Sequence, residues 1–213
     1  TTHGDLTWDA SLPVKTKTRF DSSAVTYTWT GNGGDNHWLN IANWSANKTE
    51  NFGYPDSGNA TAKFEKSWAI DLCGGTFELA KGAGLTVGTY DYMVFSNGTI
   101  KVDSAKDADF GAANTTVVFK DATLDRDRLS PVANATVTFE GAARFTGMVR
   151  PWGASGEKMN FLNGENITIG KILCGGAATG REMTISNATV TLQGSMASAM
   201  RFIQYSSLPL PVI

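Results

Sequence analysis

Charged side chains are scarce in this sequence. Asp, Glu, Lys and Arg make up 18% of its 213 residues, against roughly 25% in an average globular protein. Thr, Ser, Asn and Gly take their place, and this composition favours strands and turns over helices. The net charge is −2 and no basic stripe is present, so we expect no nucleic-acid partner.

Long apolar runs are missing as well. No stretch of eighteen apolar residues occurs, so the sequence predicts no membrane-spanning helix. The hydrophobic content of 41% still suffices for a core, and the length suits a single structural domain. The chain starts at Thr1 instead of methionine and ends in the apolar stretch 202–213. We therefore expect a trimmed piece of a longer protein.

Only two cysteines are present, Cys73 and Cys174. Two are too few for a disulfide framework, and their spacing fits no metal motif. Both stand in the same local sequence, Leu-Cys-Gly-Gly. This context favours two small buried residues before a turn over a disulfide bridge. We predict no metal site and no other cofactor.

Signals of catalysis are few. The two histidines are His3, in the expected arm, and His37, which lies close to Asp35; one histidine beside one aspartate makes neither a triad nor a metal site. A Ser-His-Asp hydrolase needs its serine on a sharp elbow, and no Gly-x-Ser-x-Gly occurs. Glutamate is scarce, although the paired carboxylates of a glycosidase can lie far apart in sequence. We predict no catalytic residues and keep a β-helix polysaccharide lyase or hydrolase as the least favoured alternative.

A loose repeat begins near residue 75. Each unit starts with a small turn residue, continues with threonine and then alternates apolar with polar residues. The repeated threonines are Thr76, Thr99, Thr116, Thr136, Thr168 and Thr189, separated by 23, 17, 20, 32 and 21 residues. A step near twenty is typical of one coil of a β-solenoid, and the long step predicts an insertion at residues 147–164. Such coils bury little alone and join into one core when they stack.

These patterns predict an all-β fold, a single-domain parallel β-helix with an N-terminal aromatic cap. We expect an arm at residues 1–24, a tryptophan-rich capping segment at 25–72 and solenoid repeats at 73–213; the only short helix is expected at 195–205. The alternative is an antiparallel β-sandwich or jelly roll, whose strands recur every 8–12 residues. A bridge between the two cysteines would contradict the solenoid, because roughly five coils would separate them by about 24 Å and a disulfide needs Cα atoms within about 7 Å.

Asparagine recurs in the pattern Asn-x-Thr or Asn-x-Ser. Such sites accept glycans in secreted eukaryotic proteins. Asparagine also tolerates the left-handed turn conformation, and we favour this explanation, which places these residues at solenoid or hairpin corners. They are Asn43, Asn47, Asn59, Asn97, Asn114, Asn134, Asn166 and Asn187.

Five of the six tryptophans lie in the first third of the chain. Exposed rings of Trp38 and Trp44 would stack on a sugar, with Asp35, Asn36 and His37 beside them. These five residues are the candidate carbohydrate site. Alternatively, the rings cover the open end of the β core, where unpaired backbone groups and apolar side chains need a cap. We favour the cap.

Residues 29–64 also carry a family resemblance. The pattern consists of Trp29-Thr-Gly31, Gly34-Asp35, Trp38, Asn43-Trp44, Pro55, Ala60 and Phe64. Together with the repeats that follow, it resembles the N-terminal module of large bacterial autotransporter-like surface proteins with β-strand repeats. This resemblance implies secretion, a parallel β-helix, and roles in adhesion, surface layers or glycan contact. It implies no catalytic residues.

We therefore expect an extracellular, non-catalytic structural or adhesion module at a bacterial cell surface. Its partners would be surface or extracellular glycans or other surface proteins. A carbohydrate-binding module is the main alternative.

Overall fold

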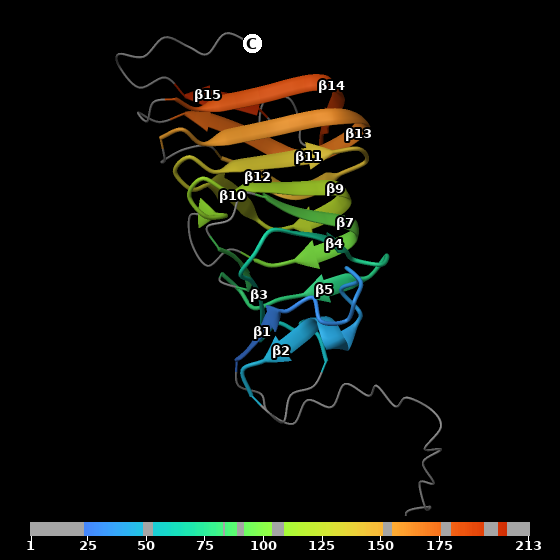
Figure 1. Ribbon diagram of the computed structural model, residues 1–213. Coiled ribbons are helices and arrows are strands. Elements are labelled where there is room, and N and C mark those ends of the chain that lie inside the picture. The colour runs from blue at the N-terminus through green and yellow to red at the C-terminus, as the bar shows by residue number, and fades with distance from the viewer. Residues whose placement is uncertain are drawn as a thin grey trace, which may run out of the picture.

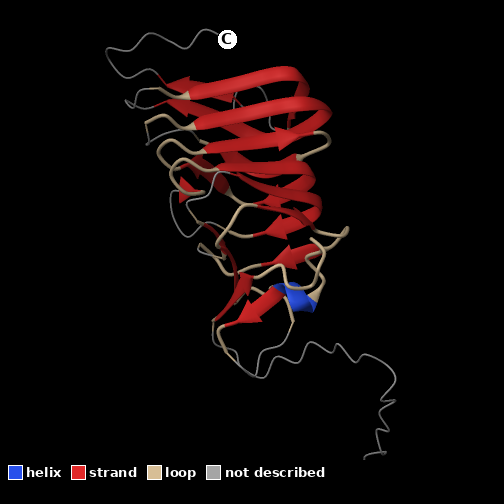
Figure 2. Ribbon diagram, in the orientation of Figure 1, coloured by secondary structure: helices blue, strands red, loops and turns tan. Residues whose placement is uncertain are grey.

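The strands of this protein stack into one column (Figures 1 and 2). The computed structural model describes residues 24–48, 53–82, 84–88, 92–103, 109–150, 155–175, 180–193 and 200–203. Within them, neighbouring strands pair in parallel and wind through about five turns. The one antiparallel pair among the named strands is β1 with β2. The predicted all-β solenoid is confirmed, and the antiparallel sandwich is not the fold.

Each turn of the column contributes strands to three faces. The first face is a continuous parallel stack. Its strands are β4 (Trp68–Asp71), the first part of β7 (Tyr92–Lys101), the first part of β9 (Thr116–Asp125), β11 (Thr136–Glu140), and the first parts of β13 (Lys158–Gly175) and β14 (Glu182–Leu192).

The second face starts at β5 (Thr76–Glu78). It continues through the later parts of β7 and β9, the start of β12 (Arg144–Val149), and the later parts of β13 and β14. In β7, β9, β13 and β14 the chain therefore bends from one face to the next inside a single strand.

The third face consists of two parallel groups. The N-terminal group contains β1 (Val25–Trp29), β3 (Ala60–Phe64) and β6 (Leu85–Val87). The other contains β8 (Asp109–Phe110), β10 (Arg128–Pro131), the ends of β12 and β13, and β15 (Met200–Ile203). The short strand β2 (Trp44–Ala46) pairs with the outer edge of β1 and follows the 3-10 helix η1 (Ile41–Asn43).

Alternating side chains fill the core. In β1, Val25, Tyr27 and Trp29 are buried and the residues between them are not, as the period-2 pattern predicts. A column of phenylalanines in register runs through the first face, and neighbouring ring centroids are 5.7, 5.6 and 5.9 Å apart. Such ring pairs add about 0.5–1.5 kcal/mol each beyond the burial of area. The members of this column are Phe95, Phe119, Phe139 and Phe161.

One turn of the column takes 20 to 25 residues. Register partners along the first face lie 25, 24, 20, 22 and 24 residues apart. The predicted step near twenty is therefore close to the observed one. These partners are Trp68, Met93, Val117, Val137, Met159 and Met183.

The predicted insertion at residues 147–164 is wrong. The strand β12 ends at Val149 and β13 starts at Lys158, inside a turn of ordinary length. The 32-residue step arose because Thr136 lies on the first face and Thr168 on the second. Threonines of both faces look alike in the sequence, so the series of repeated threonines combined residues from the first face with residues from the second.

The eight asparagines of the Asn-x-Thr and Asn-x-Ser patterns were predicted to lie at corners, and this is confirmed in part. Four of the eight have a left-handed backbone, with φ values of 55°, 63°, 58° and 49° at Asn97, Asn114, Asn134 and Asn187. Asn43 differs, because it is buried at the end of η1 and not at a corner.

Other predictions can be placed along the chain. β3 and β4 come from the segment expected as a cap, yet they pair with β6 and β7 as ordinary solenoid strands.

Residues 1–23, which make up nearly all of the expected arm, lie outside the described residues. The predicted short helix at 195–205 is wrong over Met200–Ile203, which form β15, and the rest of it is not described. No helix in the described part of the chain is long and apolar enough to cross a membrane.

Candidate functional site

The tryptophan-rich segment closes the N-terminal end of the column. Trp38 is fully buried and Trp44 is 8% exposed. The Trp38 ring centroid lies 4.8 Å from that of Trp44 and 5.0 Å from that of Phe77. The indole N–H of Trp38 donates to the carbonyl of Pro55 at 3.1 Å, and that of Trp44 donates to the carbonyl of Trp38 at 2.8 Å. Both rings are thus covered and hydrogen-bonded inside the protein, as an aromatic cap requires.

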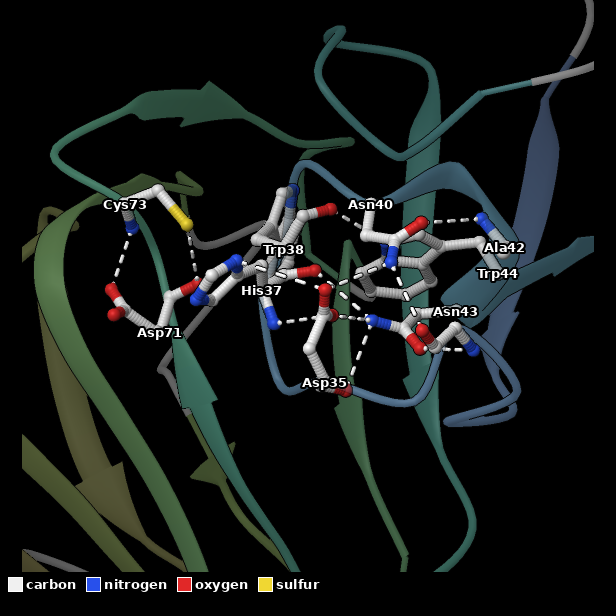
Figure 3. Close-up of polar contacts among 10 residues, drawn as sticks. Asp35, His37, Trp38, Asn40, Ala42, Asn43, Trp44, Asp71 and Cys73 are labelled. Carbon is white, nitrogen blue, oxygen red and sulfur yellow. Dashed lines mark hydrogen bonds and ion pairs between the residues drawn. The ribbon is translucent and has the colours of Figure 1, made fainter.

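A network of amides and one carboxylate holds the loop outside these rings (Figure 3). The Asp35 carboxylate accepts hydrogen bonds from the side-chain amides of Asn40 at 2.9 Å and Asn43 at 2.8 Å, and from the backbone N–H of His37 at 3.1 Å. The buried Asn43 also accepts from the N–H of Gly33 at 2.7 Å. These bonds tie residues 33–43 into one closed loop.

The same contacts determine the electrostatics of Asp35. Donation from the Asn40 amide, followed by that of the His37 N–H, lowers the pKa of Asp35 below its usual 3.8. Hydrogen bonds to the charged form favour that form. The carboxylate therefore stays ionised and keeps accepting hydrogen bonds across the neutral pH range.

Glycine is required at one point of this loop. A Cβ atom on Gly33 would lie 2.5 Å from the Asn40 amide nitrogen and 2.6 Å from the Asn43 amide oxygen. The two amides occupy the space that any larger residue would need. The spacing of Gly33, Asn40 and Asn43 is thus a packing requirement that the sequence alone did not reveal.

The five predicted carbohydrate-site residues lie in this cap, but they do not share one surface. Asp35, Asn36 and His37 are exposed, whereas the rings of Trp38 and Trp44 face the core. Stacking a sugar on either ring would require the cap to open. A sugar bound to the closed form would contact the three polar residues instead.

A second group of polar side chains lies where this loop meets the first turn. His37 and Asp71 are partners in a parallel β-bridge. The N–H of Trp38 donates to the Asp71 carbonyl at 2.8 Å, and the Asp71 N–H donates to the Asn36 carbonyl at 2.9 Å. Cys73 follows at the next corner, where its N–H donates to the Asp71 carboxylate at 2.7 Å (Figure 3). Sequence reasoning missed this group because His37 and Asp71 stand 34 residues apart.

Cys73 is exposed and forms no disulfide, and its thiol donates to the Asp71 carbonyl at 3.4 Å. The prediction of a buried cysteine is therefore wrong at this position. The side chain of Cys174, in β13, lies outside the described ones. A free Cys73 agrees with the solenoid, in which the two cysteines belong to different turns.

The outward-facing residues of the second face form a register column across the turns. Their neighbours in the strand, such as Ile100 and Leu124, are fully buried, so the alternating residues point to solvent. Five of the six residues in this register column are threonines. The column is Thr76, Thr99, Thr123, Arg144, Thr168 and Thr191.

Comparisons with protein-family models, with curated proteins and with solved structures give no match to this chain. The candidate sites are therefore interpreted from their own geometry. The resemblance to bacterial surface proteins remains a prediction from residues 29–64.

Proposed function

We propose that this chain is a non-catalytic module of an extracellular bacterial surface protein, with a structural or adhesive role. The observation that carries the proposal is the threonine column on the second face of a parallel β-stack. The resemblance of residues 29–64 to modules of bacterial surface proteins supports the location outside the cell.

Rigidity is one requirement of such a module. Each inner strand of the stack pairs on both edges, and the Phe95–Phe161 column links successive turns through stacked rings. A stack of this kind resists bending better than separate domains on linkers, because every turn contacts its neighbours. It therefore holds its outer faces in a constant geometry.

Repetition is the other requirement. Threonines in neighbouring turns stand about 4.8 Å apart, and each hydroxyl both donates and accepts hydrogen bonds. A repetitive polar partner, such as a surface or extracellular glycan or another surface protein, can meet several of them at once. Contacts that are weak singly then add up to useful adhesion.

Lysine substitutions test which face is used. Thr123→Lys combined with Thr168→Lys places two bulky charges on the second face. Thr116→Lys combined with Thr136→Lys is the matched control, because these threonines lie on the first face and, like the other two, are half-buried. The labelled wild-type protein and both variants are applied to arrays of immobilised glycans and of extracellular glycoproteins.

We expect wild-type binding to at least one class of array spot and a loss of at least roughly tenfold in the second-face variant only. Equal losses in the two variants would contradict adhesion through the second face. If the wild-type protein binds no array spot, the adhesive role is contradicted. The structural role would then remain, and the unfolding temperatures of the two variants test it.

Glycan contact at the cap loop is a second candidate function. It is favoured by the exposure of Asp35, Asn36 and His37 side by side. Asn36→Ala combined with His37→Ala would abolish binding to a glycan spot if the loop holds the sugar. If it does not, this variant retains wild-type binding on the same array.

A further inference from the structure

We propose that His37, Asp71 and Cys73 form a binding site for a thiophilic divalent ion of the zinc type. One ligand atom of each residue lies within 4.8 Å of the others. Imidazole nitrogen, carboxylate oxygen and thiolate sulfur are three ligand types that zinc accepts. The proposal concerns a site distinct from the threonine face and does not depend on adhesion.

The backbone brings these residues together before any ion binds. Two hydrogen bonds close the β-bridge between His37 and Asp71, at 2.8 and 2.9 Å. Neighbouring strands lie about 4.8 Å apart, so the bridge brings the His37 and Asp71 side chains next to each other. Cys73 is held two residues further on by its N–H bond to the Asp71 carboxylate. Three ligands on a fixed backbone lower the entropic cost of binding.

The geometry suits a tetrahedral ion. Zinc–ligand bonds of about 2.0–2.3 Å place neighbouring ligand atoms of a tetrahedron about 3.5 Å apart. The observed separations are within reach of this value through side-chain rotation, since His37 and Cys73 are exposed. Three protein ligands leave the fourth position to water, and the exposed location gives the ion direct access from solvent.

Ligand chemistry selects the class of ion. Calcium and magnesium prefer oxygen ligands and take six or more of them. A site with one sulfur, one nitrogen and one carboxylate instead favours zinc and similar transition metals. The proposed ligand is accordingly not a hard cation.

Neighbouring groups would support the ligands. Oδ2 of Asp35 lies 3.8 Å from Nδ1 of His37, which is the kind of carboxylate neighbour that orients metal-binding histidines. The Asn97 amide donates to Oδ1 of Asp71 at 3.5 Å, and the Cys73 N–H donates to the same oxygen. Both bonds reach Oδ1, and no described residue hydrogen-bonds to Oδ2 of Asp71, so this oxygen can bind an ion.

Turn geometry does not account for a cysteine at this corner. Cys73 has a φ of 54°, and Asn97 at the corner of the next turn has a φ of 55°. The left-handed region favours glycine, asparagine and aspartate, so cysteine is an unfavourable choice for the backbone. A role for the thiol would explain its presence.

Binding would be linked to pH. Zinc coordinates cysteine as the thiolate, whereas an ordinary cysteine thiol keeps its proton at neutral pH. The ion must displace this proton, and its affinity falls as the pH is lowered. Bound ion would also connect the cap loop with the first turn and stabilise the closed end of the column.

Titration of the reduced, full-length chain with Zn²⁺ tests the proposal. We expect one equivalent of Zn²⁺ to bind, with proton release and a rise in unfolding temperature that chelation reverses. Co²⁺ should give a thiolate-to-cobalt absorption band. Ca²⁺ should neither bind nor compete.

Single substitutions assign the ligands. Cys73→Ser and His37→Gln should each weaken Zn²⁺ binding by at least about tenfold, and Cys73→Ser should abolish the cobalt band. Cys174→Ser and His3→Gln are matched controls, because they alter the only other cysteine and histidine of the chain. Circular dichroism and unfolding temperatures in chelator show that each variant folds as the wild type does.

Two results would overturn the site. One is the absence of stoichiometric Zn²⁺ binding by the folded wild-type chain. The other is wild-type affinity in Cys73→Ser, or a loss that follows Cys174→Ser instead.

Discussion

The two ends of the β-column are finished in different ways. At the N-terminal end, β2 pairs with the edge of β1 and the rings of Trp38 and Trp44 are buried beneath the cap loop. At the other end, β14 pairs with β13 and with no second strand among those described. Its inward-facing Ile185 is 52% exposed. In the part of the chain that the structure describes, one end therefore closes its core and the other leaves it partly open.

The difference shows what creates burial in a solenoid. Phe161 and Ile185 are register partners on the same face, yet Phe161 is fully buried and Ile185 is not. Phe161 has a paired strand of the first face on each side, whereas Ile185 has one on a single side among the described residues. Inward orientation is thus insufficient for burial, and a terminal turn needs either a cap or another turn. Four predictions test this contrast.

The largest effect is expected from Trp38→Ala. The substitution removes a fully buried ring with contacts to Trp44, Phe64 and Phe77. Such a change costs about 3–5 kcal/mol of unfolding free energy, measured by denaturant titration. A variant that keeps wild-type stability but loses glycan binding would show instead that the ring serves a ligand and not the cap.

A smaller loss is expected from Asn43→Ala. The Asn43 side chain is buried and bonds to Gly33 and Asp35, so its removal leaves polar groups unsatisfied at a cost of about 2 kcal/mol. Asn36→Ala, at an exposed position of the same loop, is the control and should change stability by less than about 0.5 kcal/mol. Equal effects would show that the amide network does not hold the cap.

Shortening a side chain at the open end should cost little stability. Ile185→Ala should cost less than about 1 kcal/mol, because half of this side chain already meets solvent. The matched substitution Ile100→Ala, in the fully buried middle of the column, should cost about 2–5 kcal/mol. A large loss at Ile185 would mean that this residue is covered in solution.

The smallest effect concerns acid. Asp35 has a pKa below 3.8 in the folded protein, whereas an unfolded aspartate titrates near 3.9. The stability that it contributes is therefore complete above this value and is lost as the pH falls through the lower, folded pKa. Tryptophan fluorescence during acid titration should show the cap loosening below about pH 4. Asp35→Asn should show a shallower pH dependence, and identical curves would exclude this carboxylate as the cause.

Much of the fold could be predicted from local patterns. The alternation of apolar and polar residues at 25–29 and 60–64 matches the alternation of buried and half-buried side chains in β1 and β3. Asparagine before threonine marked corners at Asn97 and Asn187. These features are local, because the pleat of a strand and the steric limits of a turn depend on a few neighbouring residues.

The candidate sites depend on register instead. Nothing local distinguishes Thr116 on the first face from Thr123 on the second, and nothing local indicates that Cys73 is exposed. The group of His37, Asp71 and Cys73 exists only because a bridge joins residues 34 positions apart.

The sequence by itself thus determined the class of fold, the strand alternation and the concentration of aromatic rings near the start of the chain. The tertiary structure decided that Trp38 and Trp44 are buried, that threonines align on one face, and that His37 meets Cys73. The physical reason is that composition and periodicity act between near neighbours. Exposure and convergence are created when separate turns stack in a definite register.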